Sequence, residues 1–301
     1  MSLKSIALIG ASGNFGGLLV PELVKTDLNI TAVIRESSKA TFPSSVQVTK
    51  SDFSLKSLTE AFEGKDAVVS MLPIDAAADQ AVLIEAAIAA GVKRFLPSEY
   101  GSDSANPAVV AAVPFFEGKK KSLDLLVSKE NAISWTALVT GPFFDWTFFM
   151  GLTGFNASSK TVTLIDGGKT RFTASTSAQI SRALISVLEH ADETANKMVF
   201  VESFTTTQLD TLAAVEKVTG QKWNVAETTA EDVRAAGFQK IGEGNYKEGG
   251  GLLIQALVLG KEGLEDHAHV EGGLWNDRLG LKGESLEAVV EAIFQNAPSN
   301  S

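Results

Sequence analysis

Three evenly spaced glycines follow an apolar segment near the start of the 301-residue chain. The run Gly10-Ala11-Ser12-Gly13-Asn14-Phe15-Gly16 comes directly after residues 6–9. In a strand–turn–helix unit, the first glycine permits a tight turn, the second lets the backbone approach a pyrophosphate, and the third lets the helix pack closely on the strand. Free N–H groups at the helix start attract the anion. The spacing predicts a dinucleotide-binding turn, and a strand–helix turn without a ligand is the alternative.

Two basic residues follow the next apolar segment, residues 30–34: Arg35 and, one turn later, Lys39. At this place an acidic side chain would hydrogen-bond the ribose 2′-hydroxyl of NAD, whereas cations fit the 2′-phosphate of NADP. Glu36 is adjacent, but Arg35 is the first polar residue after the segment. The pattern favours NADP(H) over NAD(H), and a surface cation after a strand is the alternative.

Three consecutive lysines lie in a segment with helical periodicity. Helical phase places Lys119 on a stripe with Phe115 and Leu123, whereas Lys120 falls with Asp124 on a polar stripe. We expect Lys119 to point inward, where partial desolvation would lower the pKa of its amine and let it exchange protons near neutrality. Short-chain dehydrogenases usually carry a tyrosine four residues before the lysine. Here that position is Phe115, so the tyrosine-acid mechanism is not available from this helix.

Further candidate residues follow three other apolar segments. Met71-Leu72 lie at the end of the fourth segment, where a dinucleotide crosses the sheet. Ser98-Glu99 follow the fifth segment and are candidates to orient Lys119 or to contact substrate. After the sixth comes Gly141-Pro142-Phe143-Phe144-Asp145-Trp146-Thr147-Phe148-Phe149, with five aromatics in seven residues. Because open α/β sheets bind ligands at these strand ends, we expect Phe144, Trp146 and Phe149 to contact an aromatic substrate. Anchoring of a second lobe on the first is an equal alternative.

The elements that must position these residues alternate through the first half of the chain. Strands are predicted at residues 6–9, 30–34, 46–48, 67–71, 94–96 and 135–139, and helices at residues 15–25, 55–62, 76–90 and 116–129. Strands that are apolar throughout suit a parallel sheet buried on both faces. The pattern predicts an α/β, Rossmann-type, doubly wound parallel sheet. We expect an NADP-binding domain over residues 1–150 and a smaller substrate-binding lobe over residues 151–301, partly threaded back onto the first.

The second half is less regular. Strands are expected at residues 161–165 and 198–201, and helices at residues 178–188, 208–218 and 286–294. The glycine-rich stretch 242–251 is interpreted as a mobile connecting loop. His267 and His269 would share one face of a strand, but no third ligand is evident, so we expect no metal site.

Composition excludes several kinds of function. The formal net charge is −10, which argues against nucleic acids and anionic membranes as partners. Cysteine is absent, so disulfides, thiolate metal ligands and cysteine nucleophiles are excluded. No apolar run approaches the ~20 residues of a membrane helix. We expect a cytoplasmic protein, monomeric or homodimeric.

The motifs together resemble the isoflavone reductase-like and NmrA-like atypical short-chain dehydrogenases, in particular fungal members and the phenylpropanoid ether reductases of plants. The resemblance rests on the glycine run, on Val33-Ile34-Arg35-Glu36-Ser37, Ala78-Asp79-Gln80 and Val92-Lys93-Arg94-Phe95-Leu96-Pro97-Ser98-Glu99-Tyr100-Gly101, and on Phe116-Glu117-Gly118-Lys119 and Thr140-Gly141-Pro142-Phe143. It is good over residues 3–175 and thins out thereafter. Gly118 departs from the family pattern, and the substrate residues of the second lobe are not recognisable.

This resemblance implies a Rossmann lobe with NADP(H) and a catalytic lysine at Lys119. It assigns cofactor contacts to Gly10, Ser12, Gly13, Asn14, Phe15, Arg35, Lys39, Met71 and the loop Gly141, Pro142, Phe143 and Phe144. The function it indicates is NADPH-dependent reduction of a hydrophobic, aromatic small molecule, phenylpropanoid- or isoflavonoid-like, with the lysine as proton donor or relay. A non-catalytic NADP(H)-binding redox sensor of the NmrA type is the alternative, and an isomerase or epimerase that retains the cofactor is a third.

Overall fold

The computed structural model describes residues 3–296, which divide into two compact units. Unit 1 comprises Met1–Tyr100, Phe115–Val139 and Ile180–Val199, and unit 2 comprises Gly101–Pro114, Thr140–Gln179 and Phe200–Ser301. Each unit is therefore discontinuous in sequence. The assignment of cofactor to residues 1–150 and of substrate to residues 151–301 stays a prediction.

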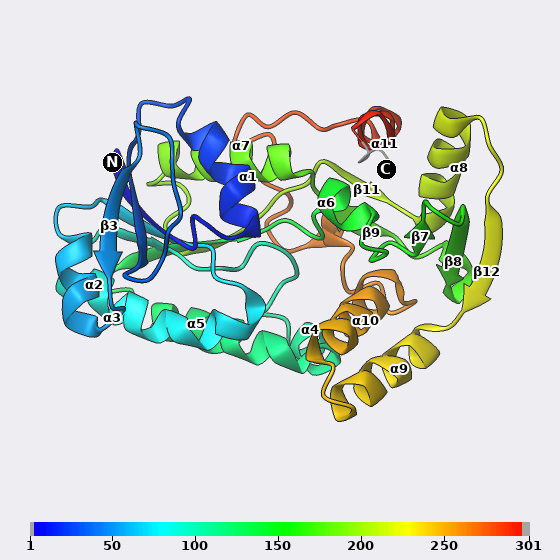
Figure 1. The fold of residues 1–301 in the computed structure, drawn as a ribbon, viewed down its shortest axis with the longest axis horizontal. Helices are drawn as coiled ribbons and strands as arrows, with labels where there is room; N and C mark the ends of the chain where they lie inside the picture. Colours follow the sequence, from blue (N-terminus) through cyan, green and yellow to red (C-terminus); the bar gives the residue numbers. More distant parts are fainter. Residues whose placement is uncertain (1–2, 297–301) are drawn as a thin grey trace. The chain divides into compact units, whose positions relative to one another are not determined.

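A seven-stranded sheet forms the centre of unit 1, in the order β10-β6-β5-β4-β1-β2-β3 (Figure 1). Its strands are β1 (Ser5–Ile9), β2 (Asn29–Arg35), β3 (Gln47–Ser51), β4 (Ala67–Ser70), β5 (Arg94–Leu96), β6 (Ser134–Val139) and β10 (Lys197–Phe200). Strands β1 to β6 pair in parallel. Because β1 lies between β2 and β4, the direction of winding reverses there, which is the switch point where open α/β sheets bind ligands. The predicted Rossmann-type sheet is confirmed.

Helices cover both faces of this sheet (Figure 1). Helices α2 (Leu55–Phe62), α3 (Gln80–Ala89) and α5 (Glu117–Ser128) lie on one face, and α1 (Asn14–Leu23) and α7 (Ser177–Glu189) on the other. Phe62, Leu83 and Leu123 of the first group belong to one hydrophobic core with Ile9 and Val33 of the sheet, and all five side chains are buried. Apolar strands enclosed on both sides account for the continuous apolar runs in the sequence.

Arg94 fastens the chain after α7 to the sheet. Its buried guanidinium donates to Thr136 Oγ1 at 2.7 Å, to Thr194 Oγ1 at 3.3 Å and to the carbonyl oxygen of Ala191. Burial lowers the pKa of Arg94 to about 10, and the charge of Asp192 opposes that shift. These bonds hold the segment that leads into β10 beside β6.

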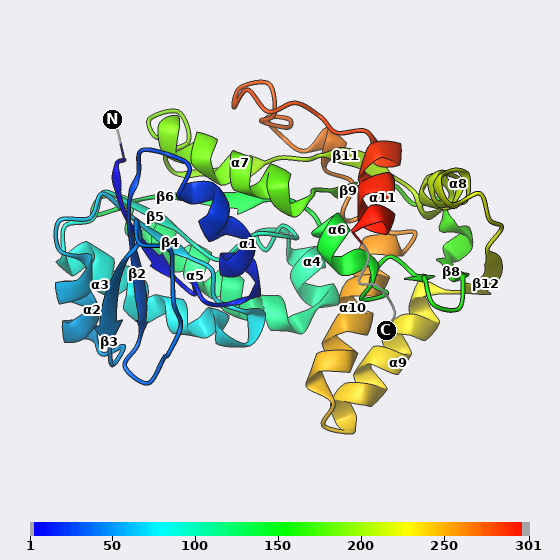
Figure 2. The same ribbon diagram turned by 45° about the horizontal axis from the view of Figure 1, so that its top comes forward.

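Unit 2 contains two small sheets and most of the later helices. Strands β9 (Phe172–Ala174) and β11 (Phe204–Thr206) are antiparallel, and β7 (Phe155–Asn156), β8 (Thr161–Ile165) and β12 (Asn224–Thr228) form a mixed sheet. The helices are α4 (Pro107–Ala112), α6 (Phe144–Phe148), α8 (Gln208–Thr219), α9 (Ala230–Gly242), α10 (Tyr246–Leu259) and α11 (Leu286–Gln295) (Figure 2). Aromatic rings dominate the core, where Phe148 stacks on Phe155 with centroids 5.3 Å apart. Among the described residues, none of the helices combines the length and apolar character needed to cross a bilayer.

The expected mobile loop at residues 242–251 is wrong, because most of this stretch belongs to α9 and α10. One of its glycines, Gly249, serves helix packing rather than flexibility. A Cβ added to Gly249 would lie 2.6 Å from the carbonyl oxygen of Gly237. The backbones of α9 and α10 can therefore come this close only because position 249 has no side chain. Asn245 caps α10 by accepting a hydrogen bond from the Glu248 N–H at 3.3 Å.

Candidate functional site

The three glycines of the first turn have separate geometric roles. Gly10 has a φ of +81°, and a Cβ there would lie 2.6 Å from the carbonyl oxygen of Met71. The Gly13 N–H donates to the carbonyl oxygen of Gly10 at 2.9 Å and closes the turn. At Gly16, a Cβ would lie 2.5 Å from the carbonyl oxygens of both Gly10 and Ala11. The turn thus requires glycine at Gly10 and Gly16, two of the three positions that the spacing indicated.

The start of α1 offers backbone donors to an anion. Gly13 occupies the N-cap position, no side chain caps the helix there, and no acidic residue lies in the first turn. Ser12, Gly13 and Asn14 are exposed, and Phe15 is half-buried. Uncapped N–H groups and the positive end of the helix dipole together favour a phosphate. The glycine-shaped turn and the open helix start fit the bridging phosphates of a dinucleotide.

Arg35 and Lys39, the two basic residues predicted to bind a 2′-phosphate, lie at and just after the end of β2. Arg35 is the last residue of β2 and is exposed, as is Lys39. The guanidinium of Arg35 lies 5.9 Å from the ring centroid of Phe53, which has an unusual φ of 64°. The Phe53 N–H donates to Ser51 Oγ at 2.9 Å and holds this conformation. An arginine beside an aromatic ring can bind a phosphate next to a base, because a guanidinium pairs with phosphate and also stacks on aromatic faces.

Lys119 is buried, with 8% of its surface exposed, as its helical phase predicted. Its Nζ donates to the carbonyl oxygen of Glu99 at 2.6 Å and lies 5.4 Å from the ring centroid of Phe116. The neighbouring Lys120 instead pairs with Asp124 at 2.6 Å on the outer side of α5. Because Glu99 follows the end of β5, the amine is held at the carboxyl edge of the sheet.

Ser98 joins the segments that follow β4 and β5. Its hydroxyl donates to the carbonyl oxygen of Leu72 at 2.7 Å, and its N–H donates to Gln80 Oε1 at 2.7 Å. Ser98 and Glu99 are both buried. The structure therefore brings Ser98, Glu99 and Lys119 into one bonded group, in which the backbone of Glu99 orients the amine. Contact of Ser98 or Glu99 with substrate stays a prediction.

Tyr100 is a residue that sequence reasoning could not place. Its ring lies 4.6 Å from that of Phe15, centroid to centroid, and within the described chain its buried hydroxyl has no hydrogen-bond partner. Burial raises the pKa of this phenol well above its usual range. Only a contact between segments distant in sequence identifies it, so spacing gave no signal.

The aromatic run of unit 2 divides between core and surface. Phe144, expected to contact both cofactor and substrate, is fully buried against Phe204 with centroids 5.1 Å apart, so its ring serves packing. Trp146 and Phe149 are 40% and 42% exposed. Phe143 is buried and meets the edge of Trp146 at 5.8 Å.

The loop that begins this run is held firmly by its backbone. Gly141 has a φ of +62°, and a Cβ there would lie 2.1 Å from the carbonyl oxygen of Thr173. The carbonyl oxygen of Pro142 accepts from the Ser175 N–H at 3.1 Å, and the Phe144 N–H donates to the Ser175 carbonyl at 2.9 Å. Contact of this loop with a cofactor stays a prediction.

A pocket of about 600 Å³ opens between the end of α6 and α10. Its lining residues are Trp146, Thr147, Met150, Gly151, Leu152, Asn245, Lys247, Glu248, Gly251, Leu252, Ile254 and Gln255. This volume lies in the range of small-molecule sites. Trp146, expected from the sequence to contact substrate, lines the pocket, whereas Phe149 does not.

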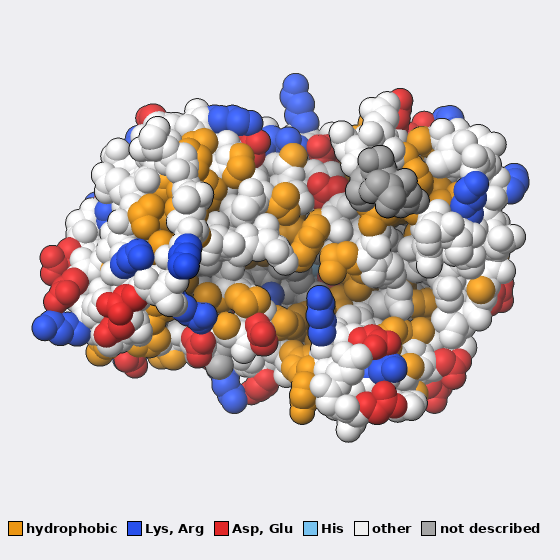
Figure 3. Space-filling view, viewed as in Figure 1, with side chains coloured by type: hydrophobic (Ala, Val, Ile, Leu, Met, Phe, Trp, Pro, Cys, Tyr) orange, Lys and Arg blue, Asp and Glu red, His pale blue; other side chains and the backbone are white. Residues whose placement is uncertain are grey.

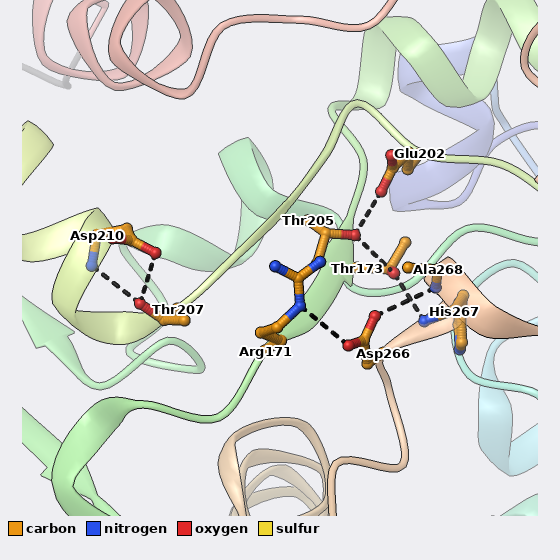
Figure 4. A network of polar contacts seen from close by, with 9 residues as sticks. All are labelled: Arg171, Thr173, Glu202, Thr205, Thr207, Asp210, Asp266, His267 and Ala268. Carbon is orange, nitrogen blue, oxygen red and sulfur yellow. Dashed lines mark hydrogen bonds and ion pairs between the residues drawn. The ribbon is translucent and has the colours of Figure 1, made fainter.

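His267 and His269 do not share a face, because they lie in a short 3₁₀ helix, His267–His269, rather than in a strand. Asp266 starts this turn by accepting from the Ala268 N–H at 3.2 Å, and the His267 N–H donates to Thr173 Oγ1 at 2.9 Å (Figure 4). His267 is buried, and burial lowers its pKa to about 4 against the opposing charge of Asp266. Across residues 3–296 we find no cluster of three or more potential ligands for a metal ion.

Comparison with known proteins agrees with this geometry. The chain belongs to the NmrA-like family, whose model matches residues 2–244. It is 34% identical over 300 residues to the oxidoreductase aprR of Aspergillus flavus, covering 98% of this chain and 100% of that protein. The family indicated by the sequence motifs is confirmed.

Solved structures share the fold at low sequence identity. A structure titled AtPrR2 with NADP+ and (+)pinoresinol superposes with a TM-score of 0.80 at 20% identity, covering 97% of this chain and 99% of that one. The leucoanthocyanidin reductase–NADPH complex of Vitis vinifera gives a TM-score of 0.80 at 16% identity, with 97% and 100% covered. Both similarities establish the fold of this chain.

Proposed function

We propose that this protein is an NADPH-dependent reductase of a hydrophobic, aromatic small molecule. The observation that carries the proposal is the buried Lys119, whose Nζ is held 2.6 Å from the carbonyl oxygen of Glu99 in the same unit as a glycine turn shaped for a dinucleotide. Its relatives support the proposal, since aprR is an oxidoreductase and two fold neighbours were solved with NADP+ or NADPH.

The cofactor would be held by groups that the fold already orients. The open N–H groups at the start of α1 would bind the bridging phosphates, and Arg35 and Lys39 would bind the 2′-phosphate. A side chain at Gly10 or Gly16 would clash with backbone carbonyl oxygens and displace the turn that faces these phosphates. When bound, NADPH supplies the hydride, and the protein contributes orientation and a proton. Contacts from Met71, Leu72 and the Gly141–Phe144 loop belong to this proposal.

Lys119 is assigned the role of proton donor or relay. An ammonium has three N–H donors, and the carbonyl oxygen of Glu99 accepts one of them, which fixes the direction of the side chain. With no tyrosine at position 115, the lysine is the basic group that α5 directs inward. It would donate or relay a proton to the reduced substrate, a role that contributes about 10²–10⁴-fold to a rate.

The substrate class is assigned from the apolar lining of the pocket in unit 2, which includes the indole ring of Trp146. Trp146 and Met150 present large apolar surfaces at the pocket between α6 and α10. One fold neighbour was solved with (+)pinoresinol, an aromatic ligand, which supports the same class here. Phe149 remains a proposed contact outside the pocket lining.

The test is oxidation of NADPH by the full-length chain with aromatic enones and benzylic ethers, followed by near-ultraviolet absorbance. Lys119→Ala should lower kcat by at least about a hundredfold with little change in NADPH affinity. Lys120→Ala is the matched control, because Lys120 pairs outward with Asp124, and should keep nearly full activity. Full activity in Lys119→Ala would remove the lysine from the mechanism. Tight NADPH binding without consumption by any substrate would favour the redox-sensor alternative.

A further inference from the structure

We propose that the α6–α10 pocket is specific for aromatic ligands that carry a negatively charged group, and that Lys247 binds this group. The inference deepens the proposed function, because it names the substrate class of the site assigned there. It depends on three features of unit 2: an apolar wall, hydrogen bonds that hold this wall in place, and two charged residues at the mouth of the pocket, of which only Glu248 has an ion-pair partner among the residues that the structure describes.

The apolar wall suits an aromatic ring. Trp146 and Met150 are 40% and 60% exposed, which is unusual for such large side chains, and Leu152 and Leu252 complete the surface. Isolated exposed apolar residues need no explanation, but a concave group of them indicates a ligand site. A flat aromatic ligand would bury these side chains and stack against the indole ring.

Gln255 keeps the pocket open before any ligand binds. Its Nε2 donates to the carbonyl oxygen of Gly151 at 2.8 Å and to that of Leu152 at 3.3 Å. These bonds connect α10 to the turn that follows α6, so the two walls are held at a fixed separation. A preformed pocket lowers the ordering cost of binding.

The two charged residues of the lining differ in their partners. Glu248 Oε2 accepts from Asn245 Nδ2, and Glu248 Oε1 lies 3.7 Å from Lys240 Nζ, which also lies 3.4 Å from Glu243 Oε2. Lys247, by contrast, is exposed and forms no ion pair within residues 3–296. The positive end of the α10 dipole lies at the same turn. The mouth of the pocket therefore presents a lysine without an ion pair in the described chain beside an apolar wall.

A pair of fluorescent probes separates the charge from the ring. Anilinonaphthalene sulfonate is an aromatic anion, and phenylnaphthylamine has the same rings without the sulfonate. The full-length chain should bind the anion more tightly. Lys247→Gln should weaken binding of the anionic probe about fivefold, the upper end for an exposed ion pair, and leave the affinity for the neutral probe unchanged. Added salt should reduce the difference between the probes.

Matched variants test each part of the argument. Lys169→Gln removes an exposed lysine of the same unit that does not line the pocket, and should change neither probe. Glu248→Gln should tighten the anion, because it removes the negative charge from the mouth. Trp146→Ala should weaken both probes. Equal loss of both probes in Lys247→Gln, or unchanged binding of both in Trp146→Ala, would overturn the inference.

The experiment distinguishes this inference from the proposed function, because probe binding needs neither NADPH nor turnover. Anion-selective binding without any NADPH oxidation would sustain the pocket and contradict the reductase. Conversely, reduction of an aromatic acid and of its neutral methyl ester with equal kcat/KM would sustain the reductase and contradict the selectivity. The result expected is a higher kcat/KM for the acid, which Lys247→Gln reduces to that of the ester.

Discussion

Glycines of the two units enable close approach for different purposes. In unit 1, Gly10 and Gly16 let a turn fold back on itself and leave the start of α1 open to solvent. In unit 2, Gly237 and Gly249 let α9 and α10 pack backbone to backbone. The first arrangement forms the proposed dinucleotide site, and the second stabilises the helix that carries one wall of the α6–α10 pocket. A glycine-rich sequence can therefore indicate either a ligand-binding turn or close helix packing. The position of the glycines relative to strands and helices decides between these two roles.

The largest effect on cofactor binding is expected at Gly16. In Gly16→Ala the new Cβ would lie 2.5 Å from two backbone carbonyl oxygens, so the turn must move. We expect NADPH affinity to fall by about a hundredfold, since small displacements of positioned groups have effects of this size, measured by calorimetric titration. Gly17→Ala is the control: no atom lies within 4 Å of its Cβ, and binding should persist. Equal NADPH affinity in both variants would contradict the proposed role of the turn.

Acid should destabilise unit 2 through His267. Its pKa is lowered from 6.5 to about 4 in the folded state by burial, so between these values the unfolded chain binds more protons. The free energy of unfolding should therefore fall as pH drops through this window, by up to about 3 kcal/mol in total. Urea unfolding of His267→Phe and of the exposed control His269→Gln measures this contribution. The pH dependence should shrink only in His267→Phe, and an unchanged dependence there would contradict the assignment.

A moderate effect on stability alone is expected at Gly249. Alanine gains about 1 kcal/mol of helix propensity, but overpacking against Gly237 costs about 1–3 kcal/mol, so Gly249→Ala should be destabilised by about 1 kcal/mol. Gly251→Ala meets no atom within 4 Å and should be stabilised instead. Urea unfolding gives both values. Loss of NADPH affinity in Gly249→Ala would break the distinction between the two uses of glycine.

An effect of similar size and opposite sign is expected at Tyr100. Because its buried hydroxyl lacks a hydrogen-bond partner in the described chain, Tyr100→Phe removes a desolvated polar group. The ligand-free variant should gain about 1 kcal/mol of stability, measured by urea unfolding. A loss of similar size would show that the hydroxyl is satisfied in the folded protein.

Features set by local periodicity could be predicted from the sequence. The strands of the main sheet, the turn at Gly10 and the inward phase of Lys119 each follow from spacing within about a dozen residues. Prediction failed where contacts between distant segments decide. The helices around Gly249 depend on Gly237, and the burial of His267 depends on β9 and on Phe200, whose ring lies 5.3 Å away.

The same distinction holds within the candidate site. The glycine turn, Arg35 and Lys119 were identified by residue type and spacing. Three contacts could not be identified in this way, because sequence spacing does not determine them. They are the hydrogen bond from Lys119 to the Glu99 carbonyl, the hydrogen bond from the Ser98 N–H to Gln80, and the ion pair of Glu248 with Lys240. Phe144 was assigned to ligands by its position in an aromatic run, but its ring belongs to the core.

Titration of the full-length chain with NADPH and with NADH tests the central claim most directly. The account predicts that NADPH binds more tightly, and that Arg35→Leu weakens NADPH by about tenfold to a hundredfold, the worth of a charged hydrogen bond, with little effect on NADH. Equal affinity for both coenzymes, tighter binding of NADH, or no binding of either would contradict it.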